Sequence, residues 1–165
     1  MAILRAIPGG GLVLVDGYKA KISKGEALDA VMNYWIVYPT LQKIGVESIG
    51  KGEEFYNDLV MMTDVNGRMP PLFEIKSKPP KGECYEYYLG PRFQFSRVWV
   101  SDTPTPWLND FENNWLLWPN VEHDDDLDSV YMAARAAEGF MPSKADRTHK
   151  RAKQRNPYLS LGSPR

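Results

Sequence analysis

The most acidic stretch of the chain runs from His123 to Asp128 and holds four aspartates within five residues. These carboxylates repel one another, so a bound cation or a helix N-terminus, whose macrodipole favours negative charge, would stabilise them. Hard divalent ions such as Mg²⁺ and Mn²⁺ prefer carboxylate oxygens as ligands. The sequence therefore leaves two interpretations open, a metal-binding site and a solvated helix cap.

A second carboxylate of interest is Glu47, which lies inside the apolar run Ile44–Ile49. A carboxylate at the end of a buried strand is costly unless it is paired, hydrogen-bonded or metal-bound, whereas on an edge strand it faces water. Two metal ions that hydrolyse a phosphodiester lie about 3.5–4 Å apart and need acids that converge from different elements. Glu47 is a candidate for the second element, with a solvent-facing side chain as the alternative.

Two groups of basic residues are candidates for contact with DNA phosphates, because such contacts dominate non-specific affinity. The DNA-binding candidates are Lys76, Lys78, Lys81, Lys150, Arg151 and Lys153. For the first three, a solvated loop is an equally good interpretation. The last three belong to a basic segment, residues 141–165, that has few apolar residues, so we expect it to be a mobile tail without a partner.

Length and composition favour one globular domain, residues 1–140, followed by that tail. The chain has 165 residues, of which 43% are hydrophobic and 25% charged, enough for one packed core. It has neither an apolar run of the roughly 18 residues that a membrane span needs nor a signal peptide, so we expect a cytosolic setting. The single cysteine, Cys84, excludes an internal disulfide and any multi-cysteine metal site.

The pattern of apolar residues predicts the elements that position these side chains. Runs at Ile3–Ile7 and Leu12–Val15 indicate a hairpin, and Ser23–Glu26 is typical of a capping box before a helix that ends before Pro39. The further predicted elements are a strand at Ile44–Ile49, a helix around Leu59, a strand at Leu72–Ile75, a short helix at Glu83–Leu89 ended by Gly90-Pro91, an extended stretch at Phe93–Val100, a helix around Phe111 and an amphipathic helix from Asp124 to Glu138. Hairpin strands followed by alternating helices and strands indicate a mixed α/β sheet.

The order of these features, from Gly11 to Ala137, resembles the nuclease domain of phage large terminase subunits. The matching pieces are Val13–Gly17, Ser23–Glu26, Val46–Ser48, Lys76–Lys81, Phe93–Val100, Leu117–Pro119 and His123–Ser129. The last piece corresponds to the family's "HDDxxDA" helix, with Ser129 in place of the usual alanine. Several motifs in the same order are more specific than any one of them.

The resemblance implies an RNase H-like mixed sheet flanked by helices and a two-metal endonuclease that uses Mg²⁺ or Mn²⁺. Its substrate would be concatemeric double-stranded viral DNA, cut during genome packaging in the host cytoplasm. Glu47, Asp124 and Asp125 match the catalytic acids, and Asp128 matches a further metal ligand. The implied partners are the terminase ATPase part, the portal and the small terminase subunit.

One part of the family pattern is missing, because its nuclease domain opens with a strand that carries the first catalytic aspartate. We find no segment before Ile3 that supplies this strand. A sheet without its central strand leaves unpaired backbone groups on two edges. Three explanations stay open: a split terminase in which a partner chain adds the strand, a truncated product, and Ile3–Ile7 in the central place. The last two would weaken or abolish cleavage.

Two further classes of function compete with the nuclease. One is a packaging or virion component that keeps an RNase H-like fold for docking to DNA or the portal without cutting. The other is an unrelated α/β binding domain with an acidic helix cap. Only the nuclease requires Glu47 and Asp125 within joint reach of a metal ion.

Overall fold

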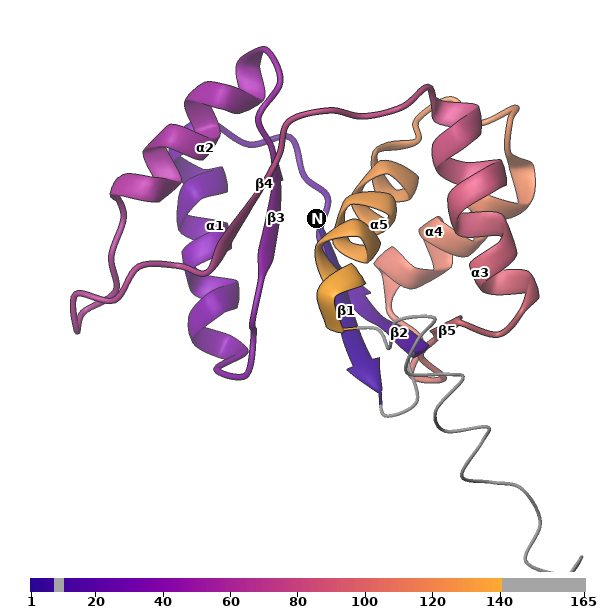
Figure 1. The fold of residues 1–165 in the computed structure, drawn as a ribbon, viewed down its shortest axis with the longest axis horizontal. Coiled ribbons are helices and arrows are strands. Elements are labelled where there is room, and N and C mark those ends of the chain that lie inside the picture. The colour runs from indigo at the N-terminus through magenta and orange to yellow at the C-terminus, as the bar shows by residue number, and fades with distance from the viewer. Residues whose placement is uncertain (8–10, 141–165) are drawn as a thin grey trace, which may run out of the picture.

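The computed structural model describes residues 1–7 and 11–140, which form a mixed α/β architecture with two small sheets (Figure 1). Helix α5 (Asp125–Ala136) contacts both sheets, through strand β1 of the first and strand β3 of the second. The helix therefore connects the two parts of the structure. The predicted tail, residues 141–165, lies outside the described residues.

The first sheet contains the predicted hairpin. Strands β1 (Ala2–Ile7) and β2 (Gly11–Gly17) are antiparallel, with a bulge between Ile3 and Leu4. Strand β5 (Val98–Val100) pairs in parallel with the other edge of β2, which gives the order β1-β2-β5. Strand β1 thus lies at the edge of this sheet, and the described residues do not show it in a central place.

The second sheet consists of two parallel strands, β3 (Ile44–Glu47) and β4 (Leu72–Ile75), joined through helix α2 (Lys51–Met61). Helix α1 (Lys24–Val37) leads into it. Both halves of the predicted capping box are present: Ser23 Oγ accepts from the Glu26 amide at 3.3 Å, and the Glu26 carboxylate accepts from the Ser23 amide at 2.8 Å. These two bonds define where α1 begins.

The region after β4 differs from the sequence prediction. The π-helix η1 (Glu83–Leu89) continues directly into helix α3 (Gly90–Gln94) instead of ending at Gly90-Pro91. A proline is tolerated in the first turn of a helix, where its missing N–H has no partner to lose. The prediction of an extended stretch from Phe93 is therefore also wrong, because Phe93 belongs to α3. The chain turns at Ser96, which has a positive φ of 50°, and becomes a strand only at Val98.

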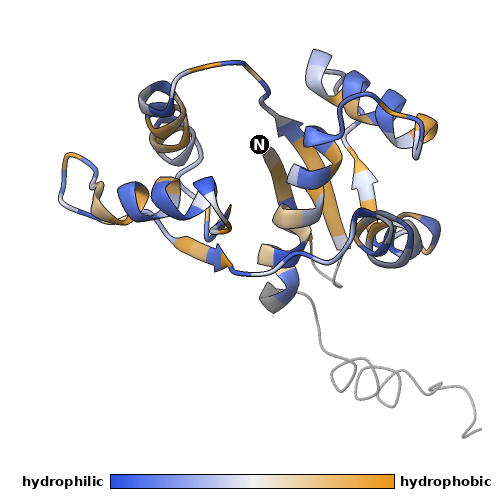
Figure 2. Ribbon diagram, turned by 90° about the horizontal axis from the view of Figure 1, so that it is seen from above, coloured by the Kyte–Doolittle hydropathy of each residue, from blue (hydrophilic) through white to orange (hydrophobic). Residues whose placement is uncertain are grey.

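The main core lies between the first sheet, η1, α5 and helix α4 (Pro106–Leu117). Its fully buried side chains include Leu12, Leu14, Tyr85, Leu89, Phe111, Leu127 and Val130. Figure 2 shows the hydrophobic residues on the strands of this sheet and on the helix faces that meet them. Within the described residues, no helix is both long and apolar enough to cross a membrane.

Candidate functional site

The acidic residues lie at the start of α5, as predicted. Asp124 is the residue that precedes the helix, and Asp125, Asp126 and Asp128 belong to its first turn. The helix macrodipole favours carboxylates at this end. The helix-cap interpretation therefore accounts for the presence of the acids, and their side-chain partners decide what else they can do.

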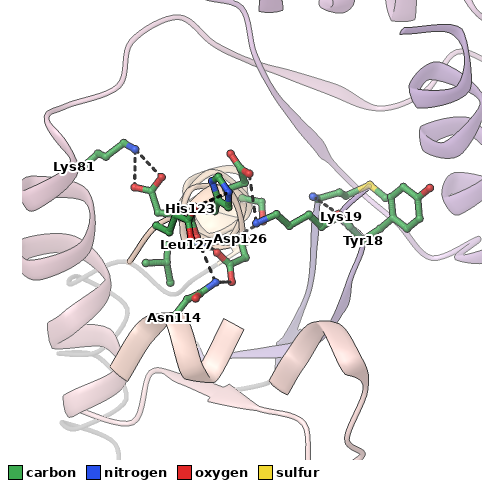
Figure 3. Close-up of polar contacts among 12 residues, drawn as sticks. Tyr18, Lys19, Lys81, Asn114, His123, Asp126 and Leu127 are labelled. Carbon is green, nitrogen blue, oxygen red and sulfur yellow. Dashed lines mark hydrogen bonds and ion pairs between the residues drawn. The ribbon is translucent and has the colours of Figure 1, made fainter. Parts of the chain in front are cut away.

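Asp124 is held by a lysine from the loop before η1. Lys81 Nζ lies 2.6 Å from Asp124 Oδ1 and 2.6 Å from Asp124 Oδ2 (Figure 3). Burial acts to raise the pKa of Asp124, but the hydrogen bond and charge of Lys81 outweigh it and hold that pKa below its ordinary value. The same hydrogen bond raises the pKa of Lys81. At neutral pH the two groups form a charged pair.

Asp128 lies one turn further along α5 and has two partners. Lys78 forms an ion pair with it, and the side chains of the two residues are only 13% and 20% exposed. The Tyr85 hydroxyl donates to Asp128 and also to Asp124 Oδ2, at 3.3 Å. Burial, followed by the hydrogen bond to Asp128, raises the pKa of Tyr85 far above its ordinary value. Tyr85 is therefore a neutral donor that links the two carboxylates.

Asp126 is a structural acid that points into the protein. It is 2% exposed, and its carboxylate accepts from Asn114 Nδ2 at 2.8 Å and from the Leu127 amide at 3.0 Å (Figure 3). These bonds fix the start of α5 against α4. No role for Asp126 could be predicted from the sequence, because no motif marks its partner Asn114 on α4.

Asp125 and Glu47, the two acids that the nuclease hypothesis requires together, line the same cavity of about 890 Å³. Glu47 is the last residue of β3, and Asp125 is the first residue of α5. The Asp125 side chain is 75% exposed and lies 3.4 Å from Lys19 Nζ. Asp128 also lines this cavity, whereas Asp124 does not. The structure thus brings Glu47, Asp125 and Asp128 to one cavity and places Asp124 beside Lys81.

The carboxylates of the described residues do not by themselves form a two-metal site. In residues 1–7 and 11–140, no three or more His, Cys, Asp or Glu side chains gather closely enough to hold a metal ion. Lys19, Lys78 and Lys81 each neutralise one of the aspartates. The donor set of the described residues is therefore incomplete without another ligand.

No family model, curated protein or solved structure matches the chain. The functional argument therefore depends on the geometry of the residues.

The predicted DNA-binding lysines have different surroundings. Lys78 and Lys81 contact Asp128 and Asp124, so they belong to the acidic cluster itself. Lys76 is 76% exposed and pairs with Glu74 at 3.1 Å on the surface. The other three candidates, Lys150, Arg151 and Lys153, lie outside the described residues. A role of these six residues in DNA binding stays a prediction.

Proposed function

We propose that the chain is the RNase H-like nuclease module of a viral genome-packaging terminase. Its substrate is double-stranded concatemeric DNA, and its place of action is the host cytoplasm. One observation carries the proposal: Glu47 from β3 and Asp125 and Asp128 from α5 line a single cavity. A metal-dependent phosphodiesterase requires acids from separate elements at one site, and a shared cavity is the first condition for this.

The proposal assigns the chain part of a metal site. Bound Mg²⁺ or Mn²⁺ would supply an activated water and stabilise the leaving oxygen. Because the donor set is incomplete, a segment that completes the sheet must add a further acid, and the natural source is the ATPase part of the terminase. Lys81 contacts both oxygens of Asp124 and would compete with a metal ion for this carboxylate.

A second candidate function is a packaging or virion component of the same fold that docks DNA or the portal without cutting. The observation in its favour is the neutralisation of three aspartates by lysines of the same chain. Charge pairs of this kind stabilise a surface without the need for a metal ion. The two candidates differ in whether DNA is cleaved.

The test is cleavage of supercoiled plasmid by the full chain in Mn²⁺, alone and with a co-expressed terminase ATPase chain. The matched variants are Glu47→Ala, Asp125→Ala and, as a control, Asp29→Ala, an exposed acid on α1. Cleavage that both site variants abolish and the control retains supports the nuclease. A folded chain that cleaves under no condition favours the non-cutting component. A Glu47→Ala variant that cleaves as well as the wild type would exclude Glu47 from the nuclease site.

A further inference from the structure

The cavity that holds Glu47 and Asp125 lies between the edges of two strands. β1 is an edge strand of the sheet β1-β2-β5, and β3 is an edge strand of the sheet β3-β4. Each of the two strands therefore has one edge without a partner strand among the described residues. Residues 1–6, which include all of β1 except Ile7, and residues 43–47, which include β3, line the cavity. The two unpaired edges therefore face the same space.

Backbone hydrogen bonds show which peptide groups of β3 point into this space. The amides of Ile44 and Ser48 donate toward β4, to Pro71 O at 2.8 Å and Ile75 O at 3.0 Å. Successive peptide groups of a strand alternate between its two edges. The peptide groups of Gly45 and Glu47 therefore point away from β4 and toward β1. Such groups need a partner, either water or another strand.

The helices that line the cavity are mainly apolar there. Helix α1 contributes Ala27, Ala30, Val31, Tyr34 and Trp35, and α5 contributes Ser129, Met132, Ala133 and Ala136. Several of these residues are small, which leaves room for backbone close to the helices. A strand with apolar side chains on both faces is typical of the centre of a sheet that helices cover. The acidic residues that the helices contribute are confined to the first turn of α5.

The direction of a bridging strand follows from its neighbours. Figure 1 shows that β1 and β3 run in opposite directions. The start of β1 lies near the start of α5, because burial lowers the pKa of the Met1 amine while the nearby charges of Asp125 and Asp126 act to raise it. A strand parallel to β3 and antiparallel to β1 would continue the parallel pairing of β3 with β4 and the antiparallel pairing of β1 with β2. Its C-terminal end would lie beside Glu47.

We propose that this cavity binds a β-strand supplied from outside residues 1–165, apolar on both faces, which joins β1 and β3 into one continuous sheet. β1 has six residues, so the strand needs about six residues, or about 20 Å. A second copy of this chain is a poor source, because every strand in residues 1–7 and 11–140 is already paired. The segment 144–155 is also a poor source, since its basic residues do not suit apolar walls.

The inference deepens the proposed function, since the added strand ends beside the acids of the candidate site. Strand binding does not itself require DNA or metal, so it can be measured separately. Peptide binding by a chain that cleaves no DNA even with the ATPase part of the terminase present would keep the strand site and reject the nuclease. Cleavage by a chain that binds no strand would reject the strand site alone.

The test uses a labelled synthetic peptide with a core of six alternating valines and isoleucines between two terminal lysines, and fluorescence anisotropy of its binding to the full chain in EDTA. Two further peptides carry N-methyl groups on alternate core amides, one on the odd set and one on the even set. A central strand donates from both sets, so we expect saturable binding that either methylation weakens at least tenfold. If the peptide joins only one sheet, only one of the two methylation sets would weaken its binding. That result, or no binding at all, would overturn the proposal.

The variants are Val31→Arg, which places a charge in the wall of the cavity, and Val65→Arg, at a position that is 99% exposed and outside it. We expect at least tenfold weaker binding for Val31→Arg and no change for Val65→Arg, with circular dichroism to verify folding. Hydrogen exchange at the Gly45 and Glu47 amides should slow when the peptide binds to the wild type. Equal affinity of the two variants, or unchanged exchange, would overturn the proposal.

Discussion

Lys81 Nζ lies 2.6 Å from both carboxylate oxygens of Asp124, across a sequence separation of 43 residues. The pair fixes the loop before η1 to the start of α5. The lysine would also compete with a metal ion for Asp124, because it contacts both oxygens of this carboxylate.

The first prediction concerns pH. The folded-state pKa of Asp124 lies below its ordinary value, so its contribution to stability is present above about pH 4 and is lost as pH falls through the lowered folded pKa. The folded-state pKa of Lys81 is raised, so its contribution is lost only as pH rises through that value. We expect Lys81→Met to lower the free energy of unfolding at pH 7 by more than at pH 3. Urea unfolding at the two pH values measures this, with Lys21→Met as an exposed control. An equal loss at both would contradict the pair.

The second prediction compares two lysines of the same loop. Lys78 pairs with Asp128 where both side chains are mostly buried, and the loss of one partner from such a pair is strongly destabilising. We expect Lys78→Met to reduce the free energy of unfolding by about 3 kcal/mol. Lys76→Met removes an exposed pair and should cost less than about 1 kcal/mol. Chemical denaturation checks both, and a similar small loss in the two variants would show that Asp128 does not need Lys78.

The sequence predicted most of the elements because local signals determine them. The capping box at Ser23, the apolar spacing of α5 and the runs of β1 and β3 all depend on neighbours within a few residues. The wrong prediction at Gly90-Pro91 came from a signal with two meanings, since a proline both ends one helix and suits the first turn of another.

The candidate site was less accessible to sequence analysis because its contacts are long-range. Tyr85 meets Asp128 across 43 residues, and Lys19 meets Asp125 from the other end of the chain. No spacing rule connects residues so far apart. The structure places Glu47 and Asp125 in the lining of one cavity, and their joint role in a metal site stays a prediction. No spacing in the sequence paired the aspartates with Lys19, Lys78 and Lys81.

The third prediction concerns the buried carboxylate of Asp126. Asn114 donates to it at 2.8 Å, and Asn114→Ala would leave a buried acceptor with fewer partners. We expect a loss of about 2 kcal/mol in the free energy of unfolding. Asn113→Ala changes an exposed neighbour on the same helix and should stay within about 0.5 kcal/mol of the wild type. Thermal unfolding of the two variants distinguishes these effects, and equal melting temperatures would exclude a structural role for the Asn114 bond.

The fourth prediction uses two glycines. A Cβ atom at Gly17 would lie 2.2 Å from the Trp107 ring, whereas at Gly25 it would meet nothing within 4 Å. Gly17→Ala must displace a buried indole, so we expect a loss of about 1–3 kcal/mol and a shift in tryptophan emission. Gly25→Ala lies in the first turn of α1 and should stabilise the chain by up to about 1 kcal/mol. Unchanged stability of Gly17→Ala would mean that the Trp107 contact is not close in solution.

The central claim is that Glu47 and Asp125 belong to one metal-dependent site, and Mn²⁺ binding to the full chain tests it most directly. Electron paramagnetic resonance of free Mn²⁺ in a titration to millimolar concentrations measures the binding. The account predicts that Glu47→Gln and Asp125→Asn each weaken the same binding event at least tenfold, while Glu112→Gln, an exposed acid on α4, has no effect. No binding by the wild type, or a loss in only one of the two site variants, would contradict it.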